Sequence, residues 1–240
     1  MPDRRRHRGP APEDGRLFAQ DQEAGLARAA AELGWLLERG YALPSALKLV
    51  GDRHALTARQ RLAVQRAACT PAQAEGRAAR RLAAGALRGR RIVVDGFNVL
   101  TTVEAALAGG VLLIGRDGCL RDMASVHGTY RIVAETGPAL ERIGTWLERH
   151  GVAAAHWLLD APVANSGRLA GFLREHAQVR DRPWTVEVVP SPDPVLCVAQ
   201  DPVATSDSVV LDRCATWVDL ARAVVRDSVP GVRVLDLSGG

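Results

Sequence analysis

Lysine is almost absent from this chain of 240 residues, and its absence excludes several classes of phosphate and carbonyl chemistry. Of the 31 basic residues, 30 are arginine, and Lys48 is the only lysine. A P-loop requires a lysine directly after its glycines. Schiff-base enzymes and phosphatases of the haloacid dehalogenase type also depend on a lysine near the reacting atoms. Lys48 lies in "ALKLV", which offers none of these contexts.

Other common signatures are missing as well. The four cysteines form no C-x-x-C pair and lie near no histidine cluster, which argues against a structural zinc site and a disulfide framework. There is no G-x-S-x-G, no H-E-x-x-H and no G-x-G-x-x-G after a strand. No stretch approaches the roughly 20 apolar residues of a membrane helix, and the arginine-rich start lacks the apolar core of a signal peptide. We therefore expect a cytoplasmic protein with reduced thiols and no membrane contact.

Charge is divided unevenly along the chain. Residues 1–90 carry 17 basic and 9 acidic residues, whereas residues 91–240 carry 14 basic and 18 acidic residues. A basic part attracts phosphate and an acidic part can hold divalent cations, so this division favours nucleic acid and metal as partners. The alternative is a compositional preference for arginine that serves no function.

The first third of the chain predicts a helical unit. Residues 1–19 mix arginine, proline and glycine without a period, and we interpret them as a flexible basic arm. Residues 20–88 are rich in alanine and leucine at helical spacing, which predicts a small helical accessory domain. "TARQ" at residues 57–60 and "TPAQ" at residues 70–73 have the spacing of a capping box, so each predicts the start of a helix.

From about residue 89 to residue 240 the pattern changes to an α/β domain. Short segments rich in branched residues alternate with helical patterns, which predicts a mostly parallel sheet with helices on both faces. The strands are expected at residues 92–95, 154–160, 185–189, 203–206, 216–218 and 232–235, and the clearest helices at residues 138–150 and 166–179.

Three strands of this predicted sheet deliver an aspartate at their ends. Asp95 ends "IVVD", Asp160 ends "AHWLLD", and Asp207 follows "VATS". Parallel strands bring their carboxyl ends to one edge, where open α/β sheets bind ligands, so we expect these carboxylates to lie together. Asp193 in "PSPDPVL" and Asp212 in "SVVLDR" are two further candidates.

Carboxylates brought together repel one another unless one takes up a proton or a cation neutralises them. Mg²⁺ or Mn²⁺ suits such a cluster, because these ions prefer oxygen ligands and bind through few carboxylates together with phosphate oxygens. Two such ions can activate a water and stabilise a leaving oxygen in phosphodiester cleavage. For each single aspartate the alternative is a helix cap or a turn.

Further polar residues surround the predicted site. Asn98 follows Asp95 in what we expect to be a turn, where its amide orients the carboxylate or contacts a phosphate; a plain turn or cap is the alternative. Residues 115–131 are expected to form a lid or substrate loop. In that loop, His127 is a candidate acid–base or phosphate-contacting group, or else a structural histidine in a β-hairpin insertion.

The stretch "NSGR" follows the strand that ends at Asp160. It places Asn165, Ser166 and Arg168 where a helix N-terminus and a guanidinium can receive a phosphate, with Ser166 as the expected N-cap. The helical unit offers six more arginines for phosphate contacts, although only Trp35 and Tyr41 lie there for base stacking. They are Arg59, Arg61, Arg66, Arg77, Arg80 and Arg81.

These motifs resemble known families. "VVDGFNVL" resembles the first motif of the PIN-like nucleases, in particular their NYN branch, and "LLDAPVANSGRL", "PSPD" and "VATSDSVVLDR" are similar to the later acidic elements. This resemblance implies a PIN/NYN-like α/β fold in which Asp95, Asp160, Asp193 and Asp207 bind metal and Asn98 supports them. The branch usually carries a second acid two residues after the fourth aspartate. Here that position is Val209, and Asp212 is the residue that could compensate.

From about residue 20 onward the chain also resembles a family of archaeal and bacterial proteins described as domain of unknown function 434, with its carboxyl half described as domain of unknown function 5616. The stretches that carry this resemblance are "RGYALPSALKLVGDRHALTARQR", "DGFNVLTTVEAALAGG" and "VHGTYR". That family implies no activity by itself.

The function that we predict is a Mg²⁺- or Mn²⁺-dependent nuclease that hydrolyses phosphodiester bonds, with RNA as the expected substrate. Two alternatives stay open from the sequence. One is a nucleic-acid or nucleotide-binding protein that keeps a nuclease-like fold without turnover, and the other is a metal-dependent phosphohydrolase acting on a small phosphate ester. The sequence leaves the oligomeric state open.

Overall fold

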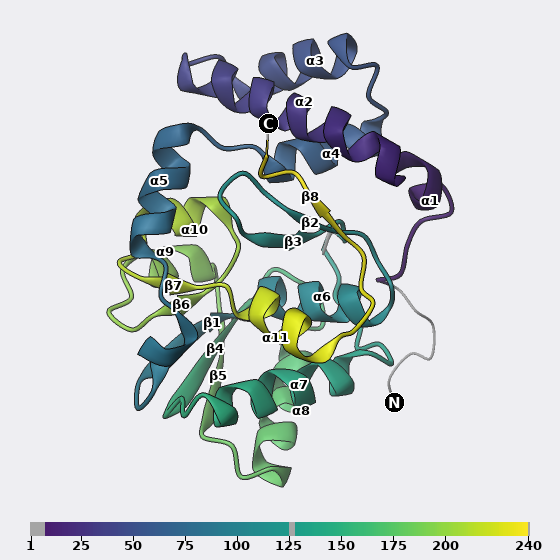
Figure 1. The fold of residues 1–240 in the computed structure, drawn as a ribbon. Helices are drawn as coiled ribbons and strands as arrows, with labels where there is room; N and C mark the ends of the chain where they lie inside the picture. The colour runs from purple at the N-terminus through teal and green to yellow at the C-terminus, as the bar shows by residue number, and fades with distance from the viewer. Residues whose placement is uncertain (1–7, 125–127, 240) are drawn as a thin grey trace.

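A computed structural model describes residues 8–124 and 128–239, and a five-stranded parallel sheet lies in its carboxyl-terminal part (Figure 1). The strand order is β5-β4-β1-β6-β7, and every neighbouring pair is parallel. The strands are β1 (Arg91–Asp95), β4 (Ala154–Asp160), β5 (Trp184–Val189), β6 (Val203–Ala204) and β7 (Trp217–Val218). The predicted fold class is thereby confirmed.

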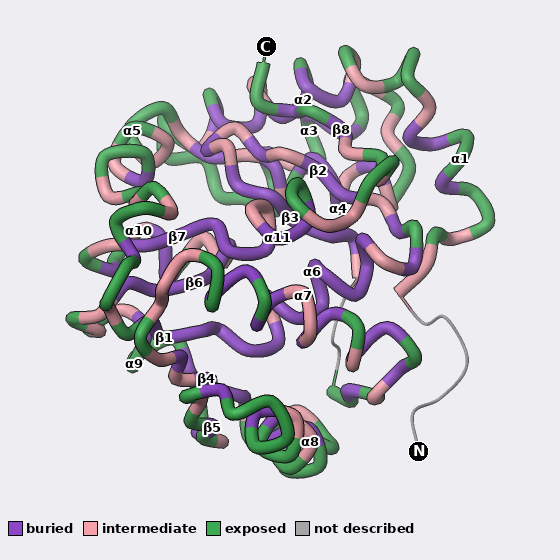
Figure 2. The backbone as a smooth tube through the Cα atoms, turned by 60° about the horizontal axis from the view of Figure 1, so that its bottom comes forward, coloured by how far each residue is buried: buried purple, intermediate pink, exposed green. Residues whose placement is uncertain are grey.

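Helices cover both faces of this sheet because the buried residues of its strands alternate between two hydrophobic clusters. Ile92 and Val94 join a large cluster with α6 (Gly96–Leu107), α7 (Thr136–Arg149), α8 (Ser166–Val179) and α11 (Leu220–Ser228). Val93 and Leu158 join a smaller cluster with α9 (Pro192–Cys197) and α10 (Ser208–Arg213). In Figure 2 the tube through the central strands is largely buried, as expected for a sheet between two helical layers.

The order of the strands reverses at β1. The chain leaves β1, returns to β4 on one side, continues outward to β5, and then crosses back to β6 on the other side of β1. Such a reversal leaves a crevice outside the carboxyl ends of the strands, which is the usual ligand site of open α/β sheets. The carboxyl end of β1 is Asp95.

The amino-terminal region is helical, as predicted. Both capping boxes are confirmed, because the side chains of Thr57 and Thr70 each accept a hydrogen bond from the backbone N–H of a glutamine three residues later. The side-chain oxygen of that glutamine accepts one from the backbone N–H of the threonine. The helices are α1 (Asp14–Leu17), α2 (Gln20–Glu38), α3 (Leu43–Arg53), α4 (Ala58–Ala67) and α5 (Pro71–Arg80), followed by a 3₁₀ turn at Ala84–Leu87.

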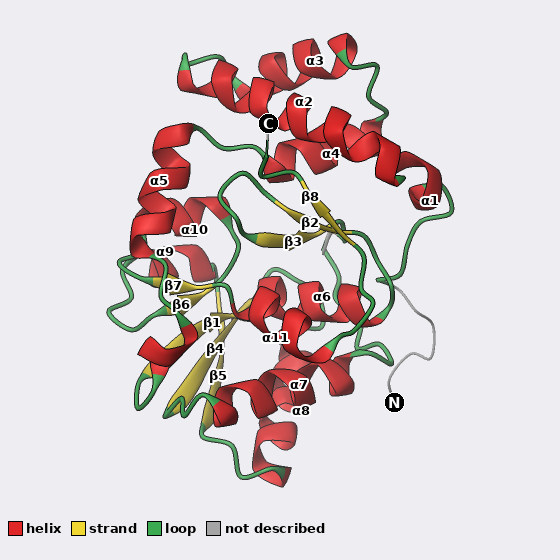
Figure 3. Ribbon diagram, viewed as in Figure 1, coloured by secondary structure: helices red, strands yellow, loops and turns green. Residues whose placement is uncertain are grey.

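A second sheet of three short strands lies between these helices and the rest of the fold (Figure 3). Its strands are β2 (Leu112–Ile114), β3 (Leu120–Asp122) and β8 (Val234–Asp236), in the order β3-β2-β8. The last strand predicted from sequence is therefore present but belongs to this sheet, and β2 and β3 were not predicted. Leu113 and Leu235 pack in one hydrophobic cluster with α2, α3 and α4, so the two regions share this part of the core.

Residues 8–18 are packed, whereas the sequence predicts residues 1–19 to be a flexible arm. Leu17 and Phe18 are buried, and Asp14 receives the guanidinium of Arg59. The reason is that two apolar residues and one paired carboxylate follow the basic stretch and reach the helical core.

Among the described residues, no helix is both long and apolar enough to cross a membrane.

Candidate functional site

Asp95 and Asp160 lie on the same face of the parallel sheet at its carboxyl edge. Asp95 pairs in register with Leu158, and Asp160 lies two residues further along the same strand. Side chains two residues apart in a strand point to the same face, and neighbouring strands lie about 4.8 Å apart. Leu158 packs in the smaller cluster together with residues of α9 and α10, so both carboxylates project on the face that these two helices cover.

Asp207 reaches this edge from the turn of residues 205–208, which joins β6 to α10 and is called the Asp207 turn below. The Asp207 carboxylate caps α10, because its Oδ1 accepts hydrogen bonds from the backbone N–H groups of Val209 (2.8 Å) and Val210 (3.1 Å). The hydroxyl of Thr205 accepts a hydrogen bond from the Asp207 backbone N–H (3.0 Å) and donates one to Oδ2 of Asp95 (2.7 Å). Thr205 therefore connects two of the predicted acids.

Asn98 lies in the first turn of helix α6 and not in the turn that the sequence predicts. Its Oδ1 accepts hydrogen bonds from the backbone N–H (2.8 Å) and the hydroxyl (3.1 Å) of Ser206. A backbone N–H can only donate, so this contact fixes the orientation of the amide. The amide oxygen thus holds the Asp207 turn and not the Asp95 carboxylate, and the NH₂ group remains as a donor at the pocket, which is the group that the predicted phosphate contact would use.

Gly96 explains why the chain can turn from strand to helix directly after Asp95. A Cβ atom at this position would lie 2.7 Å from the backbone oxygen of Leu158 and 2.6 Å from the Leu159 side chain. Contacts this short do not occur in real structures, and the backbone of β4 cannot move aside without disturbing the sheet. The glycine therefore lets α6 start in contact with β4, which keeps Asn98 beside the Asp207 turn.

These side chains line one polar cavity of about 530 Å³. Asp193, in the first turn of α9, also lines it, so the four acids expected at the metal site border the same space. The other lining residues come mainly from α4, α6, β3 and the Asp207 turn. They are Gln65, Arg66, Phe97, Asn98, Thr101, Arg121, Asp122, Ala124, Val163, Ser206 and Ser208.

The carboxylates in the cavity influence one another's ionisation. Burial raises the pKa of Asp95 to about 7; the hydrogen bond from Thr205 opposes this rise, and the charges of Asp207 and Asp160 add to it. Burial also raises the pKa of Asp160, and the charge of Asp193 raises it further. Burial and the charge of Asp207 raise the pKa of Asp193 as well. The cavity therefore holds more negative charge than its own surroundings neutralise.

The donor set matches a hard divalent cation in its chemistry but forms no closed cage. Among residues 8–124 and 128–239, no three acidic, histidine or cysteine side chains converge closely enough to hold an ion by themselves. Mg²⁺ commonly binds through one or two carboxylates and keeps several waters, which a substrate phosphate can replace. The arrangement therefore fits an open, hydrated Mg²⁺ or Mn²⁺ site and does not fit a site made of protein ligands alone.

Other residues predicted for the site lie elsewhere. The carboxylate of Asp212 is held by Gln73 (2.8 Å) and by Nε of Arg77 (2.7 Å) and does not line the cavity, so it does not replace an acid at Val209. The reason is that Asp212 lies at the far end of α10, while Asp207 lies at its start. His127 lies outside the described residues.

The "NSGR" stretch does not reach the cavity either. Asn165, and not Ser166, occupies the N-cap of α8, where it adopts a left-handed conformation and its side-chain amide donates to the backbone oxygen of Tyr130 (3.0 Å). Ser166 is buried as the first residue of the helix, and Arg168 is exposed. Asn165 and Ser166 therefore belong to the start of helix α8, and Arg168 lies on the surface. None of the three lines the cavity with the four acids.

Sequence reasoning did not place Arg121, Asp122 or Arg66 at this cavity, although it named Arg66 as a candidate for phosphate contacts. Arg121 and Asp122 lie within the predicted loop of residues 115–131, which contains β3, and only the density of charged residues there pointed to a role. Arg66 comes from α4, and its guanidinium donates to the backbone oxygens of Asp122 and Ala124 (2.9 Å to the latter). No local sequence pattern reveals such a long-range contact.

The six arginines expected to attract nucleic acid are engaged within the protein. Each of them donates to, or pairs with, a carboxylate or a backbone oxygen of another segment. Their charges therefore stabilise contacts between segments of the protein. The excess of basic residues in this part of the sequence does not form a row of unpaired cations on these helices. They are Arg59, Arg61, Arg66, Arg77, Arg80 and Arg81.

Comparison with known proteins identifies sequence relatives over most of the chain. The sequence model of the family described as domain of unknown function 5616 matches residues 84–223, and that of the family described as protein of unknown function 434 matches residues 25–80. An uncharacterized protein of Methanocaldococcus jannaschii is 29% identical over 186 residues, which cover 78% of this chain and 88% of that protein. No solved structure matches. The resemblance to these two families is thereby confirmed.

Proposed function

The chain belongs to the family described as domain of unknown function 5616, and we propose that it is a divalent-metal-dependent nuclease that hydrolyses phosphodiester bonds in RNA. One observation carries the proposal. Five carboxylates from separate segments, those of Asp122 and the four predicted acids, border one cavity at the carboxyl edge of the parallel sheet. Four of the five have raised pKa values. Carboxylates that repel one another destabilise a fold. A bound catalytic cation would neutralise them and would explain why they are gathered here.

In this proposal Mg²⁺ or Mn²⁺ binds among Asp95, Asp160, Asp193 and Asp207, through one or two of these carboxylates together with waters. A bound divalent ion supplies an activated water and charge stabilisation for the leaving oxygen, so no covalent nucleophile from the protein is required. Thr205 keeps Asp95 in place through its hydroxyl, and the N–H groups of α10 fix one oxygen of Asp207. These contacts limit the rotation of both carboxylates before any ligand arrives.

The residues around the acids offer a neutral donor for a phosphate group. The amide NH₂ of Asn98 is a donor for a phosphate oxygen, since its carbonyl oxygen is used by Ser206. The guanidinium of Arg121 makes bidentate contact with Asp117 and donates to the backbone of Ser206, so its charge is already compensated. Attraction of the substrate therefore depends on the bound cation, and RNA binding is expected to require divalent metal.

A second candidate is hydrolysis of a small phosphate ester by the same acids. The size of the cavity, about 530 Å³, supports it, because sites for small molecules have about this volume. We place either activity in the cytoplasm, since all four cysteines are free thiols and three of them are buried.

The experiment is cleavage of labelled single-stranded RNA by purified protein with Mn²⁺ or Mg²⁺. Asp95→Asn is the test variant, and Asp21→Asn, which removes a carboxylate from the exposed start of α2, is the matched control. We expect wild type and Asp21→Asn to cleave and Asp95→Asn to lose at least 100-fold in rate.

Equal cleavage by Asp95→Asn and wild type would contradict the proposal, because it would mean a contaminating nuclease or a different site. Salt-dependent RNA binding without cleavage by wild type would identify a binding protein. Metal-dependent hydrolysis of p-nitrophenyl phosphate without RNA cleavage would identify the phosphohydrolase.

A further inference from the structure

The Asp207 turn lies between two of the shortest elements of the fold. Strand β6 has two residues and helix α10 has six, so neither supplies much stability on its own. Yet the turn carries Asp207, positions Asp95 through Thr205 and receives the amide of Asn98. The geometry of the cavity therefore depends on contacts that hold this turn from outside.

Two arginines hold the backbone on either side of Asp207. Arg121 donates from Nε to the carbonyl oxygen of Ser206 (3.0 Å), and Arg77 donates from Nη2 to the carbonyl oxygen of Ser208 (3.3 Å). Arg121 comes from β3 and Arg77 from α5. The neighbouring Arg80, also from α5, donates to the carbonyl oxygen of Leu211 (2.8 Å) in α10.

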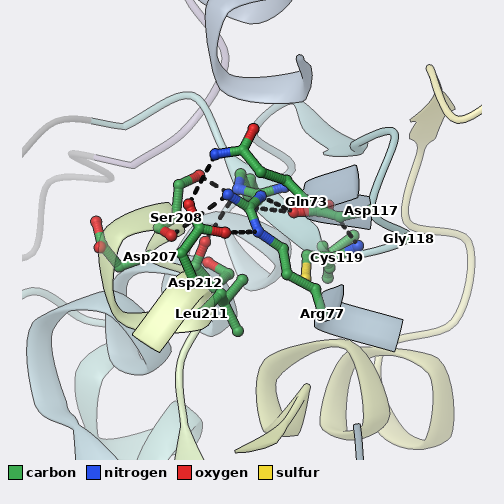
Figure 4. A network of polar contacts seen from close by, with 12 residues as sticks. Gln73, Arg77, Asp117, Gly118, Cys119, Asp207, Ser208, Leu211 and Asp212 are labelled. Carbon is green, nitrogen blue, oxygen red and sulfur yellow. Dashed lines mark hydrogen bonds and ion pairs between the residues drawn. The ribbon is translucent and has the colours of Figure 1, made fainter. Parts of the chain in front are cut away.

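One buried carboxylate fixes both arginines, as Figure 4 shows for the α5 side of the network. Asp117 accepts from Nη1 and Nη2 of Arg121 (2.8 and 2.7 Å) and from Nη1 of Arg77 (2.6 Å). The side chains of Arg77 and Asp117 are 1% exposed, so this ion pair is shielded from solvent. The planar fork of arginine has its orientation set by such bidentate contacts.

The outer end of the network is held by α5 as well. Asp212, near the end of α10, accepts from Nε of Arg77 (2.7 Å) and from Gln73 (2.8 Å). Helix α5 thus contacts α10 at both ends through one arginine, at the Ser208 carbonyl and at the Asp212 carboxylate. Arg77 belongs to the segment matched by one family and the turn to the segment matched by the other.

We propose that Arg77 is a positioning residue for the metal site, and that helix α5 is a structural part of that site and not of a separable accessory domain. The part of this proposal that concerns metal affinity rests on the proposed function. Without the guanidinium of Arg77, the Ser208 carbonyl loses this donor and Asp212 keeps only its contact with Gln73, so that Asp207 loses its fixed orientation toward the other acids.

The test compares Arg77→Lys with Arg59→Gln in the full chain. Lysine keeps a positive charge beside Asp117 but cannot contact Asp117, Asp212 and the Ser208 carbonyl at the same time. Arg59→Gln removes another partly buried ion pair of the same helical region, with Asp14, away from the cavity. If the helical region is weakened in general, both variants therefore lose exchange protection and Mn²⁺ affinity to a similar extent.

Two readouts separate the positioning role from the nuclease proposal. Hydrogen exchange of the Val209 and Val210 amides reports on the Asp207 cap without any ligand, and we expect at least tenfold faster exchange in Arg77→Lys and less than twofold change in Arg59→Gln. Calorimetric titration with Mn²⁺ is expected to give at least fivefold weaker binding for Arg77→Lys and unchanged binding for Arg59→Gln.

Wild-type exchange rates at both amides in folded Arg77→Lys would overturn the positioning role, as would equal acceleration in Arg59→Gln. If wild type binds no Mn²⁺, the proposed function fails while the exchange result still decides the role of Arg77. If Arg77→Lys does not fold, the same exchange experiment is carried out on Arg80→Gln. This variant removes the contact with the Leu211 carbonyl at the edge of the same network. Unchanged exchange in folded Arg80→Gln would then overturn the claim that α5 holds this turn.

Discussion

Replacement of Asp95 by asparagine is expected to stabilise the metal-free protein, because the ionised Asp95 carboxylate is buried among other acids. Burial and these charges raise its pKa from 3.8 to about 7. A rise of about 3 units at about 1.4 kcal/mol per unit corresponds to roughly 4 kcal/mol, which is the largest cost that ionisation can add. Asparagine keeps an acceptor oxygen for the Thr205 hydroxyl but carries no charge.

The sign of the pH dependence follows from the raised pKa. Below about pH 4 the carboxyl group is protonated in both the folded and the unfolded protein, so ionisation costs nothing. Between about pH 4 and pH 7 the unfolded chain releases the proton while the folded protein retains it, and the folded state loses stability as the pH rises. Above about pH 7 the cost is constant. The advantage of Asp95→Asn therefore grows from near zero at pH 4 to at most about 4 kcal/mol at pH 8.

Urea denaturation in EDTA at pH 5, 6, 7 and 8 measures this difference, with Asp21→Asn as the exposed control that should show little pH dependence. Adding Mn²⁺ at 100 times its Kd should stabilise wild type by about 2.7 kcal/mol and reduce the advantage of the variant. An Asp95→Asn protein that is no more stable than wild type at pH 8, or a difference that does not change with pH, would refute the reasoning.

Two further predictions concern the buried network and the missing acid. Asp117→Asn should lower the free energy of unfolding by about 3–5 kcal/mol in urea denaturation at pH 7, because two buried guanidinium groups lose their shared counter-charge. The Arg121 guanidinium holds the pKa of Asp117 well below its usual range, so this contribution should begin to decline as the pH falls below about 4 and be lost only as the pH approaches that lowered pKa. A loss under about 1 kcal/mol at pH 7 would contradict the role of the ion pairs. Val209→Asp should change the calorimetric Mn²⁺ affinity less than twofold, because Val209 is 47% exposed and does not line the cavity. Tenfold tighter binding would show that this position does contribute a ligand.

The central sheet and its acidic edge could be predicted because each depends on local sequence. A short branched run that stops at an aspartate defines both a strand and the place where its side chain emerges, and the parallel arrangement then brings separate ends together. Strand β4 has the predicted bounds, and Asp95 and Asp160 project at one edge. Asp193 follows from the same reasoning, since α9 begins just after β5.

The second sheet and the first turn of α6 could not be predicted for the opposite reason. Strands β2 and β3 have three residues each, too few for a visible alternation. Strand β8 was predicted, but its place in this sheet was not, because it pairs with a segment about 120 residues earlier in the chain. At Asn98 the sequence "DGFN" favours a turn by its glycine and asparagine, but close packing on β4 selects a helix start. Tertiary contacts decide both cases, as they commonly do where local preference is weak.

The arginines of the helical region show why charge alone did not identify their role. A solvated basic face and a set of buried ion-pair donors have the same composition, and only the positions of their acceptors distinguish them. Arg77 meets Asp117 and Asp212, which lie 40 and 135 residues further along the chain, so the pairing is invisible until the fold is known. The guanidinium groups of Arg77 and Arg121 donate hydrogen bonds to the carbonyl oxygens that flank Asp207. Some of the basic residues of the chain therefore fix the position of an acidic residue at the cavity. A repulsive cluster of acids needs such a rigid support, since mobile carboxylates would separate before a cation could join them.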